Sequence, residues 1–166
     1  MERLTRTLLS PWLLGALLFV AAAGGLRTGL KLYALSQYND ALAAPERITV
    51  TDATEPLLTF AKACDLQIHG DPLEAIRFYG TLLQQGDAHF RAKVRYNLGT
   101  LYLRDAAKLW KERGLLEHVR INTLLAAAKD HLRESLTLEP AQWDARYNLE
   151  YAYRITPPPK EKPKTD

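Results

Sequence analysis

The sequence predicts an all-α protein, in which an N-terminal transmembrane helix precedes an antiparallel array of helix hairpins with about five helices. Three observations support this fold class. Residues 7–26 carry no charge, and such a stretch can span a hydrocarbon core about 30 Å thick. Residues 55–156 alternate helical apolar patterns with proline, glycine and aspartate breaks. The tetrapeptide Arg-Tyr-Asn-Leu begins at Arg95 and again 51 residues later at Arg146, which indicates repeated structural units.

Charge is distributed unevenly along the 166 residues. The net charge is +3, but residues 1–31 hold four basic side chains and one acidic one, which leaves 18 of each sign in the remainder. The excess of positive charge therefore lies beside the apolar stretch, as is typical of a membrane flank. This distribution argues against nucleic acid as a partner.

Residues 1–35 are interpreted as a short cytoplasmic start followed by a transmembrane anchor. A cleavable signal peptide is the alternative, because Ala21-Ala22-Ala23 resembles a small-residue cleavage site. We favour an uncleaved anchor, since the apolar run is longer than an ordinary signal core and Leu30 and Leu35 continue its helical pattern. Residues 36–54, which show little periodicity, are predicted to form a linker.

The remaining breaks define five helices and a tail. A helix begins near Pro56 and ends at Gly70, and Asp71 caps the next helix, whose predicted inward positions are Leu73, Ile76, Tyr79 with Gly80, and Leu83. The other three helices are predicted at 88–113, 117–138 and 141–155. The helical domain thus covers 55–156, and the Pro- and Lys-rich residues 157–166 are predicted to be a disordered tail.

This pattern resembles the tetratricopeptide repeats, which are helix hairpins of about 34 residues. The matching positions are Ala75 and Tyr79 in one helix, Leu98, Gly99 and Tyr102 in the next, Ala128, Leu132 and Pro140 in the third, and Leu149 and Tyr153 in the last. Gly99 and Ala128 lie further apart than in an ordinary repeat, which implies a lengthened hairpin. Glu150 replaces the small residue of the motif, as a terminal capping helix allows.

The overall layout also resembles the MxaK-type accessory proteins, which accompany the methanol dehydrogenase genes of methylotrophic bacteria. The resemblance rests on the anchor, the chain length, the divergent repeats and the segment from Pro140 to Glu150. It implies a single-pass protein of the bacterial inner membrane with its helical domain in the periplasm. It further implies an accessory role in maturation or calcium loading of the PQQ-dependent methanol dehydrogenase, alongside an AAA+ ATPase and von Willebrand A-type membrane proteins.

No motif in the sequence indicates catalysis or a cofactor. The single cysteine, Cys64, excludes an intrachain disulfide. Zinc spacings, phosphate-binding glycine loops, nucleophile elbows and calcium loops are all lacking. We therefore predict a protein that is not an enzyme and that binds no metal or cofactor itself.

Protein partners are the predicted ligands. Residues 91–113 carry seven basic and two acidic side chains, whereas residues 40–90 carry three basic and eight acidic ones. The basic stretch either neutralises the neighbouring acidic helices or docks an acidic partner. The candidate protein-binding residues, taken from this stretch and from polar positions of the first helix of each unit, are Arg95, Asn97, Arg104, Lys108, Lys111, Arg146 and Asn148. Asn97 and Asn148 could equally bridge helices.

Two other functions are consistent with the sequence. The chain could be a periplasmic repeat adaptor in another envelope or cytochrome assembly pathway. It could also self-associate through apolar residues of the long hairpin, among them Trp110, Leu115 and Leu116.

Overall fold

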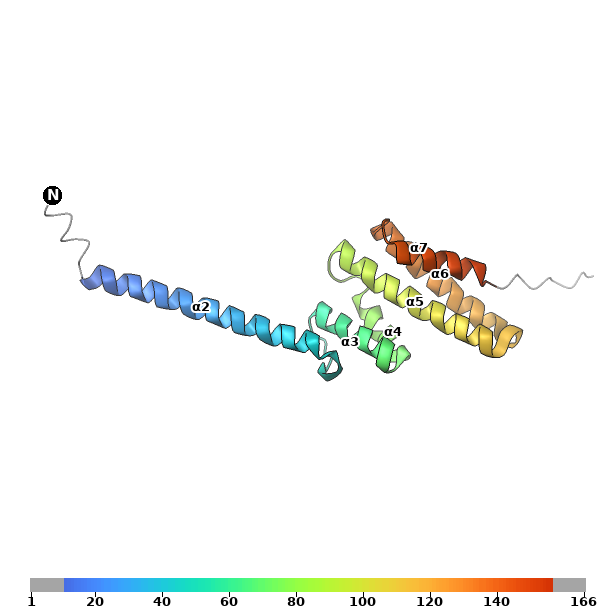
Figure 1. Cartoon of the computed structure of the whole chain (residues 1–166), viewed down its shortest axis with the longest axis horizontal. Helices are drawn as coiled ribbons and strands as arrows, with labels where there is room; N and C mark the ends of the chain where they lie inside the picture. Colours follow the sequence, from blue (N-terminus) through green and yellow to red (C-terminus); the bar gives the residue numbers. More distant parts are fainter. Residues whose placement is uncertain (1–10, 157–166) are drawn as a thin grey trace, which may run out of the picture. The chain divides into compact units, whose positions relative to one another are not determined.

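The computed structural model describes residues 11–156 and divides the chain after Ala44 into two compact units, which we describe separately. Helices are the only regular secondary structure within the described residues. The predicted fold class is confirmed: a long apolar helix comes first, and five α-helices arranged as a hairpin array follow it (Figure 1).

The first unit is the helix α2 (Pro11–Ala43), which is long and apolar enough to cross a membrane. Its helical structure continues through residues 36–43, which the sequence analysis assigned to the linker, so that part of the prediction is wrong. These residues include neither proline nor glycine, and nothing stops the helix until Pro45. A proline disfavours the helical conformation of the residue before it, which explains the end at Ala43.

The second unit begins with the short 3-10 helix η1 (Pro45–Arg47) and a first hairpin of α3 (Pro56–His69) and α4 (Pro72–Leu82). The turn between the two helices contains only Gly70 and Asp71, so they pack against each other in antiparallel orientation. The Asp71 carboxylate accepts a hydrogen bond of 2.8 Å from the backbone N–H of Leu73, as expected of an N-cap.

A second and longer hairpin consists of α5 (Ala88–Arg113), the 3-10 helix η2 (Gly114–Glu117) and α6 (His118–Leu138). The Asp87 carboxylate caps α5 by accepting from the backbone N–H of Phe90 at 2.7 Å. Gly114 ends α5 with a positive φ of 54°, a conformation that glycine adopts without a steric penalty. The last helix, α7 (Trp143–Arg154), packs on α6 and also contacts α5.

Two apolar clusters form the core of this unit, and α5 contributes to both. The first joins α3, α4 and α5, and the second joins α5, α6 and α7. The inward face of α4 agrees with the prediction at Tyr79, which is fully buried, and at Ile76 and Leu83, which pack on the first cluster. Leu73 and Gly80 are exposed, contrary to the prediction, and Ala75, Phe78 and Leu82 are buried in addition. The apolar periodicity of α4 fits two helical faces, and contact with α3 and α5 determines which one is buried.

Candidate protein-binding surface

Gly99 lies at a close contact between α5 and α6. A Cβ at this position would come within 2.8 Å of Leu132 Cγ and 3.1 Å of the Ala128 carbonyl oxygen. Both neighbours are fully buried. The glycine therefore permits the contact on which the lengthened hairpin depends, and these three motif positions meet in space.

Asn97 joins the first hairpin to α5. Its side-chain amide donates to the Tyr79 hydroxyl at 3.2 Å, and that hydroxyl donates its single proton to Gln67 Oε1 at 2.8 Å, with Cys64 Sγ 3.2 Å away. Burial raises the pKa of both the Cys64 thiol and the Tyr79 phenol, so both groups stay neutral. The structure therefore places Asn97 between helices, as one of the two predicted alternatives, and not on a free surface.

Arg95 also lies between helices, where it forms an ion pair with Glu134 of α6. Beside this pair, the ring of Tyr102 stacks on the His131 imidazole, with centroids 5.8 Å apart and planes inclined by 8°. Burial lowers the pKa of His131, and the Arg95 guanidinium lowers it further. Arg95 and Tyr102 therefore hold α5 against α6.

Arg146 and Asn148 of α7 occupy the motif positions of Arg95 and Asn97 but lie in a different environment. The Asn148 side-chain amide donates to Thr100 Oγ1 of α5 at 3.0 Å, and Leu149 packs on the second core cluster. Arg146 is exposed, donates to the Pro140 carbonyl oxygen at 3.1 Å and lies 4.8 Å from the centre of the Trp143 ring. Asn148 thus bridges α7 to α5, whereas Arg146 remains on the surface.

Tyr153 lies at the surface rather than in the core, with its hydroxyl accepting a hydrogen bond of 3.1 Å from Arg133 Nε. Of the motif positions, Ala75 and Leu98 are buried in the first cluster, while Pro140 lies exposed in the turn before α7.

A groove opens between α4 and the far half of the long hairpin. Its volume is about 310 Å³. The apolar wall is formed by Leu73, Ile76, Tyr102, Leu109 and Leu124, and the charged side chains at its rim are Asp105, Lys108, Glu112 and Arg120. Leu73 is exposed because it faces this groove instead of the core. The groove exists because α5 and α6 extend past the shorter first hairpin, a consequence of the lengthened hairpin predicted from the sequence.

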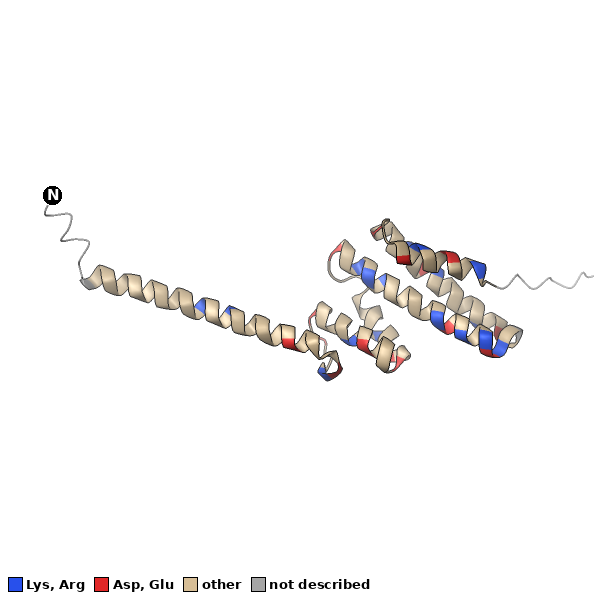
Figure 2. Cartoon of the chain, viewed as in Figure 1, with Lys and Arg blue, Asp and Glu red and all other residues tan. Residues whose placement is uncertain are grey.

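Arg104, Lys108 and Lys111 form one exposed stripe on α5, because positions i, i+4 and i+7 share a helix face. Lysines and arginines lie along α5, several of them near its C-terminal end (Figure 2). Within residues 11–156, none of these three forms an ion pair. Arg104 donates instead to the Gln67 carbonyl oxygen at 3.1 Å.

Asp105, at the groove rim, interacts electrostatically with Arg104 and Lys108 of this stripe. Burial raises its pKa, while Arg104, Lys108 and Arg120 act in the opposite direction. The groove rim itself holds two carboxylates, Asp105 and Glu112, and two cations, Lys108 and Arg120. The excess of positive charge comes from Arg104 and Lys111, which lie beside the rim on the same face of α5 as Lys108.

Two exposed apolar features flank this region of the unit. At the hairpin tip, Leu116 and Val119 are exposed and Trp110 lies at the margin of exposure; the side chain of Leu115, named in the sequence analysis, lies outside the described residues. The second feature is a stripe of Trp143, Tyr147 and Tyr151 on α7, which the sequence analysis missed. The sequence indicates this stripe, because three aromatic residues follow one another at four-residue spacing in the last predicted helix.

Comparison of the chain with protein-family models, with curated proteins and with solved structures gives no match.

Proposed function

We propose that this chain is a membrane-anchored interaction scaffold, which binds a segment of a protein partner in the groove between α4, α5 and α6. The observation that carries the proposal is the groove itself, whose apolar wall lies beside the cationic stripe Arg104, Lys108 and Lys111. An amphipathic segment with apolar residues on one face and carboxylates on the other matches both features. Charge attraction would steer the encounter, and burial of apolar side chains would supply affinity.

The anchor role falls to α2, whose length and composition suit a membrane span. The proposed location is the bacterial inner membrane, with the helical unit in the periplasm. This part of the proposal follows from the likeness to the MxaK-type proteins described above.

The same likeness suggests the partner. We propose an accessory role in maturation or calcium loading of the PQQ-dependent methanol dehydrogenase, with the enzyme, an AAA+ ATPase or von Willebrand A-type membrane proteins as the bound species. The chain would act by holding its partners together at the membrane. No catalytic step and no calcium site is assigned to its own residues.

Affinity capture from gently solubilised native membranes, followed by mass spectrometry, tests this function. The full-length protein should recover methanol dehydrogenase or its ATPase and von Willebrand A-type accessory proteins. The variant with Arg104, Lys108 and Lys111 replaced by Glu should lose this recovery. A control with Arg47, Arg77 and Lys93 replaced by Glu changes the net charge equally at exposed positions outside the groove and should retain it.

If the two variants recover the partner proteins equally well, the groove is not their binding site. Recovery of an unrelated envelope or cytochrome assembly complex would reject the methanol dehydrogenase assignment while leaving a membrane-anchored adaptor.

A further inference from the structure

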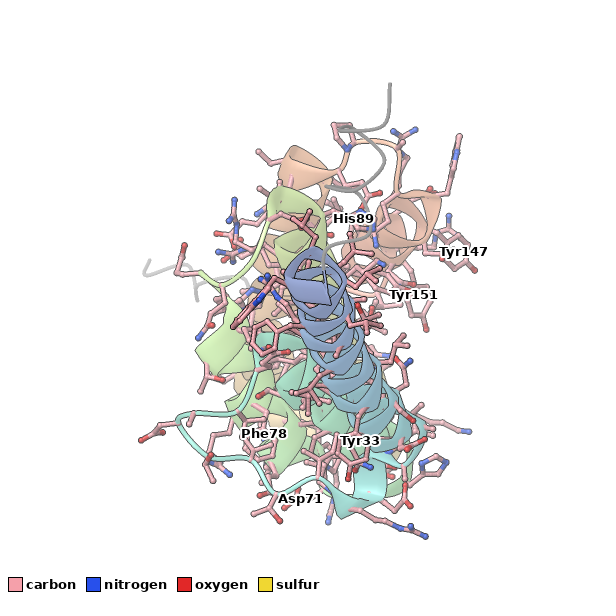
Figure 3. The ribbon with its side chains drawn as sticks, turned by 90° about the vertical axis from the view of Figure 1, so that its left-hand side faces the viewer. Tyr33, Asp71, Phe78, His89, Tyr147 and Tyr151 are labelled. Carbon is pink, nitrogen blue, oxygen red and sulfur yellow. The ribbon has the colours of Figure 1, made fainter. Side chains whose placement is uncertain are left out.

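One face of α7 presents three large aromatic side chains to solvent. Trp143 is 74%, Tyr147 72% and Tyr151 40% exposed. They occupy positions i, i+4 and i+8 and form one stripe along the helix, and Tyr147 and Tyr151 project from the same side of it (Figure 3). We call Trp143, Tyr147 and Tyr151 the α7 stripe. Aromatic residues of this kind are enriched where proteins contact one another.

The internal repeat shows what covers the equivalent face in α5. The 51-residue offset of the Arg-Tyr-Asn-Leu motif maps the α7 stripe onto Ala92, Tyr96 and Thr100. Ala92 is fully buried, and its carbonyl oxygen accepts a hydrogen bond of 2.8 Å from Ser135 Oγ of α6. Tyr96 packs against the second core cluster.

Thr100, the last of the three, accepts its hydrogen bond from Asn148 of α7. Within the array, this face of a first helix is therefore covered by the helices that follow it. In α7 the same face carries larger and more apolar side chains, yet α7 is the last helix of the described residues. Within residues 11–156 no helix covers it, so this face is available to a helix of another molecule.

The charges beside the stripe identify that molecule. Arg146 and Glu150 lie four residues apart on one flank of the stripe and carry opposite charges. When two copies of one helix pack antiparallel about a two-fold axis, each flank meets the same flank of its partner. With the axis between Tyr147 and Asn148, Arg146 of each copy lies within one residue's rise of Glu150 of the other, and Trp143 lies within one residue's rise of Tyr151. The pattern is complementary to itself.

We propose that α7 pairs in antiparallel orientation with α7 of a second copy of this chain, through the α7 stripe. Glu150 now accepts a hydrogen bond of 2.6 Å from Arg154, and Arg146 stacks on Trp143, so both charges are already held on this flank. The proposed dimer is independent of the groove between α4, α5 and α6, since no residue of the stripe lines that groove.

The proposed contact buries little surface, so the dimer depends on a high local concentration of the chain. At about 200 Å² per aromatic side chain, the exposed fractions amount to roughly 370 Å² per copy, or roughly 740 Å² in the pair. Stable interfaces between freely diffusing proteins bury more than about 1,000 Å². The dimer should therefore be weak in dilute detergent and should form when two copies are held at high local concentration in one membrane.

Cysteine cross-linking of the full-length protein in native membranes tests the pairing and its direction. In a Cys64→Ser background, Tyr147→Cys lies near the two-fold axis and should form a disulfide-linked dimer under mild oxidation. Lys93→Cys, exposed on α5, controls for random collision and should yield at least about tenfold less dimer. Two differently tagged chains carrying Trp143→Cys and Tyr151→Cys should cross-link to each other, whereas Trp143→Cys alone should not.

Charge exchange tests the proposed flank contact. Glu150→Arg should lower the Tyr147→Cys cross-link several-fold, and the double variant Arg146→Glu with Glu150→Arg should restore it. A Tyr147→Cys yield no higher than that of Lys93→Cys would overturn the dimer. A Trp143→Cys homodimer as abundant as the mixed pair would overturn its antiparallel direction. Far-UV circular dichroism of each variant verifies that the helices remain intact.

Discussion

Replacement of Gly99 by alanine tests the close approach of α5 and α6. Alanine favours the helix by about 1 kcal/mol over glycine. At this site, however, the new methyl group would lie 2.8 Å from Leu132 Cγ and 3.1 Å from the Ala128 carbonyl oxygen. Leu132 is fully buried and the carbonyl belongs to the helix backbone, so neither can move freely. Overpacking of this kind costs about 1–3 kcal/mol.

The two effects together predict that Gly99→Ala leaves stability unchanged or lowers the free energy of unfolding by up to about 2 kcal/mol. Gly99→Leu adds further atoms and should cost at least about 1–3 kcal/mol. Gly80→Ala is the matched control, because Gly80 lies in α4 and a methyl group added there would have no neighbouring atom within 4 Å. It should stabilise the protein by about 0.5–1 kcal/mol.

Denaturant unfolding of the full-length chain in detergent, followed by circular dichroism, measures these differences. A double-mutant cycle with Leu132→Ala sharpens the test. That substitution alone should cost about 2–5 kcal/mol, but it makes room for the methyl group, so Gly99→Ala should become stabilising in its presence. If Gly99→Ala stabilises the parent chain as much as Gly80→Ala does, the close approach of the two helices is refuted.

Three further substitutions test individual contacts. Asn97→Ala removes two part-buried donor bonds, to the Tyr79 hydroxyl and to Cys64 Sγ, and should cost about 1–3 kcal/mol. Asn148→Ala breaks one bond, to Thr100, and should cost about 0.5–1.5 kcal/mol; denaturant unfolding compares the two. Asp87→Ala removes the cap of α5 and should cost about 1 kcal/mol. Because the folded protein lowers the pKa of His131, its neutral form stabilises the fold above about pH 6.5, and this stability is lost as pH falls toward the folded pKa. His131→Phe should therefore reduce the loss of stability between about pH 7.5 and pH 5, and an unchanged pH profile would refute this role.

The helix boundaries were predictable because local chemistry sets them. Asp71 and Asp87 cap helices through their own carboxylates, and Gly114 ends α5 with the backbone conformation that glycine allows. The helix end at Ala43 was missed because the polar residues before it reduce the periodicity without breaking the helix. Only a proline or glycine breaks it, and none occurs between residue 36 and Pro45.

The candidate surface was predictable only in part, because polar residues in a repeat motif can face either solvent or a neighbouring helix. Arg95 and Asn97 have the composition of a binding face but lie between helices, where Glu134 and Tyr79 satisfy them. Lys108 lines the groove. The groove arises from the unequal lengths of two hairpins, so no local sequence pattern around Lys108 reveals it.

Photo-cross-linking from the groove tests the central proposal most directly. A benzophenone side chain in place of Lys108 in the full-length protein, illuminated in native membranes, should capture a discrete partner protein that mass spectrometry can identify. The same probe in place of Lys93, which is exposed on α5 but does not line the groove, should capture none. Capture of one heterologous protein from position 108 alone would support a scaffold that binds its partner in this groove. The absence of a partner at position 108, or the same products from both positions, would contradict it.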